Sequence, residues 1–389
     1  MTAVDVVVVG AGVVGASFAL SLEQADVSVA LIEPLPPALL SDDSYWDARV
    51  YTISPGNAAW LRALDVWRLL PPDRICRVET MLVYGDREGS SLEFSAYDAG
   101  LRELAYVVEH RQLQHALWQA LQGMAHVRLI EGTRCAEVSW GRERARLVLE
   151  DGSELNARLT VAADGADSWL RGRAGIRQSV YDYRQRGVVA NFSTQRAHED
   201  TAYQWFRRDG VLALLPLPGE RVSMVWSTPQ ERAAELLALS PESLCDEVAE
   251  ASKHVLGPLK LITKAAGFRL RRQRVARLVE PRAALLGDAA HNVHPLAGQG
   301  VNLGLRDARE LSEVLTRRGA QRDCGDYALL RRYERARKED IMALDLTTDG
   351  LEKLFSAEPV SLTRLRNLGL AMVDAQPWLK KVLIRRAVA

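Results

Sequence analysis

Three residues able to bind a metal stand at intervals of three in the stretch "LLGDAAHNVHPLAGQGVNLGLRD", residues 285–307. They are Asp288, His291 and His294, and on a helix they would share one face. However, the preceding strand should end near Gly287, and Pro295 pushes His294 toward an extended backbone. No further cluster of histidines or cysteines in the sequence completes a metal shell. We therefore expect no metal, and we favour loop support over proton relay for the two histidines.

The same stretch, residues 285–307, is better explained as a cofactor-binding segment. A strand that ends in Asp288 would present a carboxylate to sugar-like hydroxyls. Glycines then permit close backbone approach to a flat ring at the start of a helix, whose positive end would stabilise charge on a reduced flavin. We expect FAD here, lined by Gly298, Gln299, Gly300, Val301 and Asn302.

A second cofactor-binding pattern lies at the N-terminus, in "VDVVVVGAGVVGASFALSLEQADVSVALIE". A strand over 4–9, a helix and a strand over 27–32 form one βαβ unit. Gly10, Gly12 and Gly15 complete G-x-G-x-x-G, and the unpaired N–H groups at Val13 and Val14 would face a pyrophosphate. Glu33, at the end of the second strand, can accept hydrogen bonds from a ribose. The motif alone does not separate FAD from NAD.

The elements that must position these residues predict an α/β fold. We expect a Rossmann-like FAD-binding domain with a parallel sheet over 1–180 and 272–325, interleaved with a mostly antiparallel substrate-binding β-sheet domain over 181–271. A C-terminal helical region should cover 326–389. We expect the second sheet to wall an apolar pocket, and ordinary sheet core is the alternative for each candidate. The candidates are Tyr203, Trp205, Leu212, Leu214 and Trp226.

Composition narrows the function further. Fifty basic and fifty acidic residues balance, which removes the electrostatic argument for a nucleic-acid partner. Four widely spaced cysteines without C-x-x-C favour reduced thiols and the cytoplasm. We find no signal peptide. The C-terminal segment 364–389 is basic and amphipathic and could touch a membrane surface or a partner protein; a helix closing the nucleotide domain is the simpler alternative.

Over essentially its whole length, the chain resembles the single-component FAD aromatic hydroxylases, and within them the bacterial ubiquinone-biosynthesis hydroxylases (the UbiH/UbiF/UbiI group). The resemblance rests on "VVGAGVVG" with Glu33, "AADGADSWLR", "GDAAHNVHPLAGQGVNLGLRD" and "LRNLGL". It implies that Asp288 contacts the FAD ribityl chain and that Pro295 and the backbone over 298–302 line the ring, with His294 near it. Asp164 and Gly165 belong to a motif linked with FAD and NAD(P)H, and the resemblance also implies that Arg49 and Arg111 lie near FAD.

The resemblance also implies a reaction. NAD(P)H would bind transiently and reduce FAD, O2 would give a flavin hydroperoxide, and one oxygen atom would pass to a polyprenylated phenol. Such a substrate implies work at the inner membrane periphery or beside other quinone-biosynthesis proteins. The flavin would carry the chemistry, so no catalytic triad is expected. The alternatives are another phenol hydroxylase, a prenyl reductase, or a non-catalytic FAD-binding subunit of a quinone-biosynthesis complex.

Overall fold

The computed structural model describes residues 2–38, 45–85, 91–293, 298–319 and 321–356, without the side chains of 345, 347–349 and 351–356. His294 and Pro295 and the basic segment 364–389 lie outside these ranges. Across the described part of the chain, every helix is too short or too polar to cross a lipid bilayer.

The first sheet has a parallel core in the order β19-β11-β1-β2-β8, as expected from the βαβ pattern. Val6, Val7 and Val8 of β1 are fully buried, because strands covered on both faces need apolar side chains at every position. The described strands of this sheet are β1 (Thr2–Val9), β2 (Val29–Glu33), β8 (Val127–Glu131), β9 (Cys135–Trp140), β10 (Ala145–Leu149), β11 (Glu154–Ala162), β18 (Val279–Glu280) and β19 (Ala283–Leu285).

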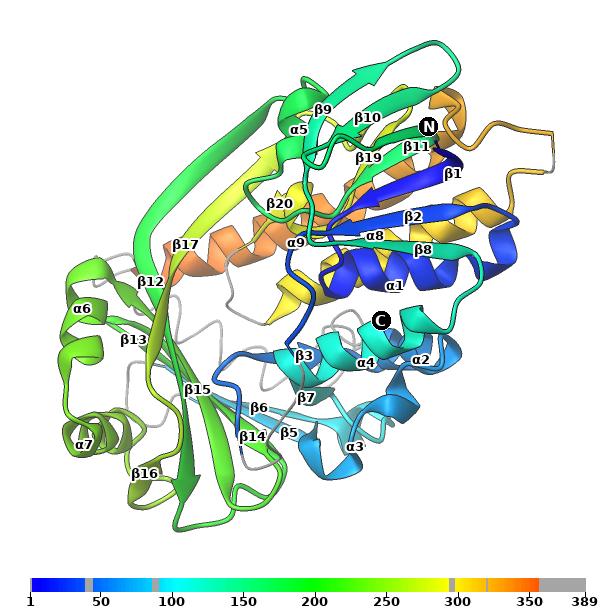
Figure 1. Cartoon of the computed structure of the whole chain (residues 1–389). Coiled ribbons are helices and arrows are strands. Elements are labelled where there is room, and N and C mark those ends of the chain that lie inside the picture. Colours follow the sequence, from blue (N-terminus) through cyan, green and yellow to red (C-terminus); the bar gives the residue numbers. More distant parts are fainter. Residues whose placement is uncertain (1, 39–44, 86–90, 294–297, 320, 357–389) are drawn as a thin grey trace.

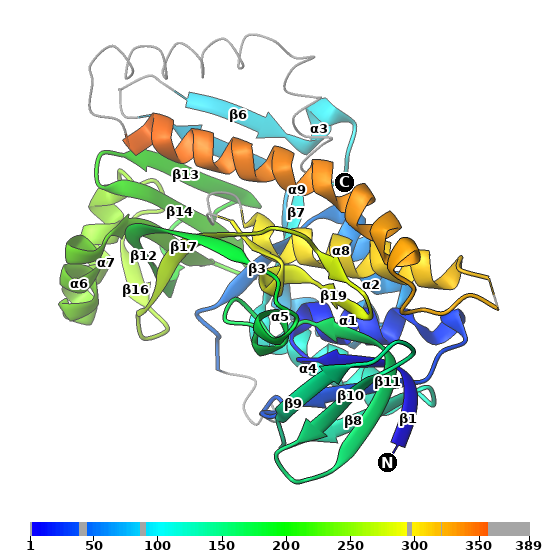
Figure 2. The same ribbon diagram turned by 90° about the horizontal axis from the view of Figure 1, so that it is seen from above.

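Helices pack beside this sheet and bring distant parts of the sequence together (Figure 1). α1 (Val13–Ser21) contacts both α4 (His110–Gln122) and α8 (Gln299–Thr316), and α8 contacts α9 (Tyr327–Ser356). Figure 2 shows α9 running from the side of α8 toward the large sheet that contains residues 178–229. α9 occupies the first part of the region 326–389 in which we expect helix, and residues 357–389 lie outside the described ranges. The apolar side chains of α8 at Leu305, Ala308, Leu311 and Leu315 recur at helical spacing and are buried on one face, with Val301 half-buried at its start.

A small sheet and a large, mostly antiparallel sheet complete the fold, and the predicted α/β architecture is confirmed. The small sheet has β7 (Ala105–Glu109) between β3 (Val50–Ile53) and β4 (Ile75–Val78). The large sheet contains β5 (Thr80–Tyr84), β6 (Ser91–Ser95), β12 (Gln178–Thr194), β13 (Thr201–Arg207), β14 (Gly210–Leu217), β15 (Arg221–Pro229), β16 (Leu259–Leu261), β17 (Ala266–Val275) and β20 (His291–Asn292). Its outer face is covered by α6 (Gln230–Ala238) and α7 (Pro241–Ala251) (Figure 1).

The large sheet draws strands from both sides of the expected boundaries 181 and 271. β5 pairs in parallel with β13, and β20 pairs with β17. The domain limits thus stay a prediction, and these strands tie the two parts together. The shorter described helices are α2 (Pro55–Ala63), α3 (Ala96–Ala99) and α5 (Trp169–Arg173), with 3-10 turns at Glu23–Ala25, Trp67–Leu69, Pro72–Arg74 and Gly287–Ala289.

Candidate functional site

The turn between β1 and α1 contains three glycines. Gly10 and Gly15 pack closely against neighbouring atoms, whereas the space beside Gly12 is open. A Cβ on Gly10, whose φ is +98°, would lie 2.5 Å from Ala163 O, and one on Gly15 would lie 2.0 Å from Gly10 O. A Cβ on Gly12 would meet nothing within 4 Å, and its backbone is extended. α1 begins at Val13 without a capping side chain or an acidic residue in its first turn. The helix start, with the N–H groups of Val13 and Val14, is therefore suited to an anion.

Glu33 lies beside this turn, at the end of β2. Its Oε2 accepts a hydrogen bond from the Ala11 amide at 2.7 Å, and its Oε1 accepts one from the Leu35 amide at 3.0 Å. These bonds fix the carboxylate next to the start of α1. Each oxygen keeps a second acceptor position for a hydroxyl group.

The turn that carries Asp288 meets the start of α1 through Val14. Built Cβ atoms on Gly287 and Gly304 would lie 3.2 Å and 2.6 Å from Val14 Cγ2. The Asp288 side chain is solvent-accessible, yet desolvation raises its pKa against the opposing effects of His291, Arg49 and Arg271. The Asp288 carboxylate is thus flanked by protein but still reached by water. A ligand with hydroxyl groups could replace that water and donate hydrogen bonds to the carboxylate.

The start of α8 is held against β3 by Asn302. Its Oδ1 accepts hydrogen bonds from the Ser54 amide at 2.8 Å and from Asn57 Nδ2 at 2.9 Å, and its Nδ2 donates to Thr52 O at 2.7 Å. The Asn302 side chain is therefore occupied by structural bonds, and only its backbone could line a ring. Gly298 has a φ of +60°, and a Cβ there would lie 2.0 Å from Thr52 Oγ1.

The first residues of α8 remain accessible. Gln299, Gly300 and Val301 are half-buried, and a Cβ on Gly300 would meet nothing within 4 Å. α8 also begins without a capping side chain or an acidic residue. It therefore presents a second open, positive helix end.

Asp47 brings the two predicted arginines together. Its Oδ1 accepts from the Arg49 amide at 2.9 Å and its Oδ2 from the Arg111 amide at 3.2 Å. The guanidinium of Arg49 lies over the Tyr51 ring, 5.4 Å from its centroid, and has no carboxylate partner among the described residues. The guanidinium of Arg111 lies over the Tyr45 ring at 4.8 Å. These contacts place Arg49 and Arg111 on the same carboxylate, and their place beside a cofactor stays a prediction.

Tyr51 and His110 form a pair that sequence reasoning missed. The Tyr51 hydroxyl lies 3.0 Å from His110 Nδ1. Burial raises the pKa of Tyr51 to about 12, and burial followed by Arg49 lowers the pKa of His110 to about 4. Both groups are therefore neutral at pH 7, and one uncharged hydrogen bond joins the hydroxyl to Nδ1. Nothing in the sequence joins these positions, because they meet only through the pairing of β3 with β7.

Asp164 and Gly165 follow β11 at the same edge of the first sheet. Asp164 Oδ2 accepts from the Leu170 amide at 3.1 Å, whereas its Oδ1 is buried without a partner among the described residues. A Cβ on Gly10 would lie 2.9 Å from Asp164 Cα, which places this loop against the glycine turn. Gly165 has a φ of +83° and allows the chain to turn away.

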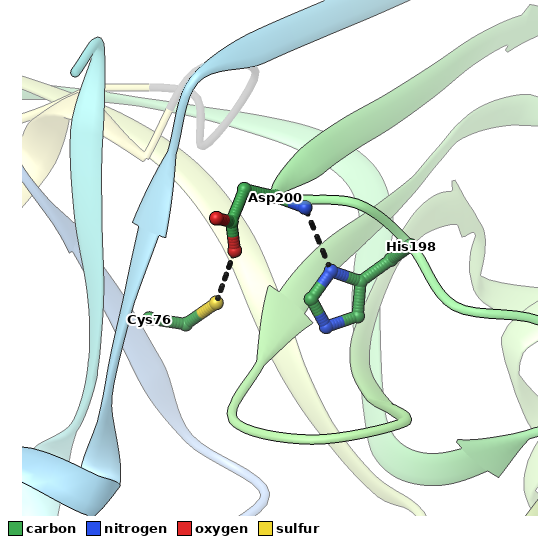
Figure 3. A group of neighbouring side chains, drawn as sticks. All are labelled: Cys76, His198 and Asp200. Carbon is green, nitrogen blue, oxygen red and sulfur yellow. Dashed lines mark hydrogen bonds between the residues drawn. The ribbon is translucent and has the colours of Figure 1, made fainter. Parts of the chain in front are cut away.

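A second group of possible metal ligands, Cys76, His198 and Asp200, lies between β4 and β13 (Figure 3). His198 Nε2 lies 2.8 Å from both Leu217 O and Gly219 O, so this nitrogen carries the proton. Its Nδ1 accepts from the Asp200 amide at 3.1 Å. Burial, with Asp200 beside it, raises the pKa of the Cys76 thiol to about 12. Both histidine nitrogens are occupied and the thiol stays protonated, so this group is a hydrogen-bonded core cluster.

The five predicted pocket-wall residues lie on the outer face of the large sheet. They are buried together with Ala233, Leu236, Leu244 and Val248 of α6 and α7. Because side chains alternate along a strand, their neighbours Ala202 and Leu215 instead pack with Trp46 and Val107 beside the small sheet. The alternative reading, ordinary core, therefore applies to Tyr203, Trp205, Leu212, Leu214 and Trp226. The inner face carries the half-buried Val211, Ala213, Leu215 and Val225.

The residues present fit FAD. Two open helix starts can face negative charge, and the carboxylates of Glu33 and Asp288 can accept hydrogen bonds from hydroxyls. Asp164 Oδ1, which has no partner in the described part of the chain, can accept a further hydrogen bond. These features come from both ends of the sequence and meet around Val14.

Known proteins are similar to this chain in sequence and in fold. The model of the FAD binding domain family matches residues 3–345. A 3-demethoxyubiquinol 3-hydroxylase of Escherichia coli is 33% identical over 99% of this chain and 98% of its own length. A ubiquinone hydroxylase of Rhodospirillum rubrum is 34% identical over 99% of this chain and 89% of its own. Among solved structures, the p-nitrophenol 4-monooxygenase of Pseudomonas putida covers 100% of this chain and 99% of its own, with a TM-score of 0.79 and 17% identity, and so shares the fold.

Proposed function

Because the chain belongs to the family of FAD-dependent hydroxylases that includes the ubiquinone-biosynthesis enzymes, we propose that it hydroxylates the aromatic ring of a polyprenylated phenol in ubiquinone biosynthesis. It would use O2 and take electrons from NAD(P)H. The observation that carries the proposal is the meeting of both glycine-rich segments at Val14, where a built Cβ on Gly304 would lie 2.6 Å from its Cγ2.

Each part of the site has a role in this proposal. The N–H groups of Val13 and Val14 hold the pyrophosphate, and Gly12 leaves room for it. Glu33 and Asp288 accept hydrogen bonds from the ribose and the ribityl chain. The backbone over 298–302 faces the ring, where the positive end of α8 stabilises negative charge. Asp164, Gly165, Arg49 and Arg111 border the cofactor. When bound, FAD supplies the redox chemistry that activates O2.

The substrate ring would lie against the inner face of the large sheet. Val211, Ala213, Leu215 and Val225 are apolar and half-buried there, whereas the outer-face residues are closed beneath α6 and α7. An apolar, partly open surface suits a hydrophobic phenol and excludes water from the reacting ring. A contact with the inner membrane or with other quinone-biosynthesis proteins stays a prediction that rests on the basic segment 364–389.

Purified protein tests the proposal directly. It should be yellow, and a short-chain prenylphenol should stimulate NAD(P)H oxidation and O2 consumption with formation of a hydroxylated ring. Colourless protein that cannot be reconstituted with FAD would refute the proposal. Turnover without O2 consumption would instead indicate a reductase on the same scaffold.

A deletion strain identifies the reaction in the cell. The quinone intermediate that accumulates should lack one ring hydroxyl, and a plasmid carrying the wild-type gene should remove it. Asp288→Ala should fail to do so although the protein is made. Full complementation by Asp288→Ala would indicate that this carboxylate is not part of the working site.

A further inference from the structure

The carboxylate of Asp307 holds the chain on both sides of Asp288. Asp307 lies in α8 and is fully buried. Its Oδ2 accepts hydrogen bonds from the Gly287 amide at 3.1 Å and from His291 Nε2 at 2.6 Å. Because a carboxylate only accepts, Nε2 is the protonated nitrogen of His291. One oxygen atom therefore fixes the residue before Asp288 and the residue three positions after it.

Arg337 of α9 holds the other oxygen of this carboxylate. Its Nε lies 2.7 Å from Asp307 Oδ1, and its Nη1 lies 2.7 Å from Asp340 Oδ2. Arg306 Nη1 lies 3.2 Å from the same Asp340 oxygen. Burial opposes ionisation of Asp307, but His291 and Arg337 outweigh burial and hold its pKa below the usual range. Two carboxylates and two guanidiniums thus balance in charge at the contact of α8 with α9.

The backbone of Asp288 has a separate support. Gln273 of β17 donates from Nε2 to the Asp288 carbonyl at 3.1 Å, and Gln273 is buried. The backbone on either side of Asp288 is thus fixed, while its side chain is left accessible. These supports act on the backbone, so they orient the Asp288 carboxylate without occupying its own acceptor positions.

We propose that Asp307, with His291 and Arg337, is a positioning element that aims Asp288 at FAD and makes α9 part of the cofactor site. The proposal rests on the proposed FAD-binding function. Groups that orient a ligand residue from behind are sensitive to substitution, because an outer partner of a metal ligand typically contributes about 10- to 100-fold in affinity. We expect a similar effect on the affinity for FAD.

Four substitutions in the full-length protein test the proposal. Arg337→Gln and His291→Leu each remove one contact to Asp307. His291→Gln restores a donor near the position of Nε2. Arg331→Gln is the matched control, because Arg331 pairs with Glu334 on the same helix and does not contact the 287–292 turn. FAD affinity is measured by titrating the FAD-free proteins and following quenching of flavin fluorescence, with thermal unfolding of each FAD-free protein alongside.

Arg337→Gln and His291→Leu should raise the Kd for FAD by at least about 10-fold. His291→Gln should recover most of the affinity, and Arg331→Gln should stay within about 2-fold of the wild type. If Arg337→Gln does not fold, the comparison of His291→Leu with His291→Gln tests the proposal. The first variant removes the hydrogen bond to Asp307 Oδ2, and the second keeps a donor for it. Folded Arg337→Gln or His291→Leu protein that binds FAD like the wild type would overturn the proposal.

Hydrogen exchange adds a test that needs no variant. In FAD-free wild type, the Gly287 amide should exchange slowly because it already donates to Asp307. Rapid exchange of this amide without FAD would mean that the turn is not held in advance, and would also overturn the proposal. The two proposals fail separately: a wild type that binds no FAD contradicts the proposed function, whereas equal binding by wild type and variants contradicts only the positioning role.

Discussion

Val14 of α1 and Gly304 of α8 lie in direct contact although 290 positions separate them in the sequence. A Cβ on Gly304 would stand 2.6 Å from Val14 Cγ2 and 3.1 Å from Gly287 Cα. The absence of a side chain at Gly304 therefore lets the first helix, the Asp288 turn and α8 meet. The contact joins the part of the site expected to hold pyrophosphate to the part expected to hold the flavin.

Gly304→Ala should destabilise the protein even without FAD. The added methyl group overlaps Val14, and overpacking of this kind costs about 1–3 kcal/mol. The better helix propensity of alanine offsets about 1 kcal/mol of that cost. Chemical denaturation of the FAD-free protein measures the change in the free energy of unfolding. Val14→Ala in the same chain should restore part of the loss, and strictly additive effects would show that the two positions do not interact.

Gly12→Ala should separate folding from FAD binding. A Cβ at Gly12 meets no protein atom within 4 Å and the backbone is extended, so the FAD-free protein should unfold at an unchanged temperature. The same methyl group should displace the pyrophosphate and weaken FAD binding by about 10-fold or more, equivalent to about 1.4 kcal/mol. Gly15→Ala is the contrast, since its Cβ would lie 2.0 Å from Gly10 O and should lower stability by about 3 kcal/mol. Unchanged FAD affinity in Gly12→Ala would place the pyrophosphate elsewhere.

Sequence patterns predicted the parts of the site that lie on consecutive residues. The strand over 4–9, the glycine turn and the acid at Glu33 are local, and β1 and β2 occur where expected. The buried face of α8 likewise follows from the spacing of apolar residues within one continuous segment. In the large sheet, alternation gives two sets of side chains but does not say which set turns inward. Alternation therefore could not decide whether Trp205 and Leu214 face a pocket or the helices α6 and α7, since only tertiary packing orients a sheet.

Side-chain contacts between residues far apart in the sequence could not be predicted from local patterns either. Asp307 belongs to the quoted motif, but its contact with Arg337 depends on how α9 returns along α8. Likewise, the Tyr51–His110 pair depends on the pairing of β3 with β7. Local propensities do not encode such contacts, because they arise from the order in which strands and helices pack.

His110 should make stability fall in mild acid. Its folded-state pKa is about 4, below the unfolded value of about 6.5, so the unfolded state binds the proton first as pH falls. The stability that neutral His110 contributes is fully present above pH 6.5, and it is lost as the pH falls from 6.5 through 4. A shift of this size corresponds to at most about 3 kcal/mol. Urea unfolding at pH 7 and pH 4.5 measures it. His110→Asn keeps an uncharged side chain that can hydrogen-bond to Tyr51, and it should flatten the pH dependence. An equal slope in both proteins would rule out His110 as its source.

The four cysteines should be unreactive in the folded protein. All are buried, and burial raises the pKa of Cys76, Cys135 and Cys324 to about 12 and that of Cys245 above its usual value. A thiol reagent at pH 8 should therefore label almost no thiols in native protein and four after denaturation. Zinc should not change this result, because both nitrogens of His198 are occupied. Zinc-dependent protection or binding at Cys76 would contradict the hydrogen-bonded arrangement.

Ala213→Phe should affect substrate turnover while leaving FAD bound. The added ring would fill the inner face of the large sheet, where Ala213 is half-buried. Displacement of the substrate should lower kcat/KM for a prenylphenol by about 10-fold or more. Glu220→Phe, at the exposed turn between β14 and β15, is the control for adding a large ring. Flavin absorbance should be equal in both variants, and unchanged kcat/KM in Ala213→Phe would remove the inner face from the substrate site.

During translation, β5 leaves the ribosome well before its parallel partner β13 has been synthesised. β11 likewise waits for β19, more than 120 residues later in the chain. The nascent chain therefore carries strand edges that have no partner until β13 and β19 have been synthesised, and such edges pair with other chains when left open. Overexpression should consequently favour slow translation and low temperature, and fragments that end before residue 285 should accumulate as aggregates.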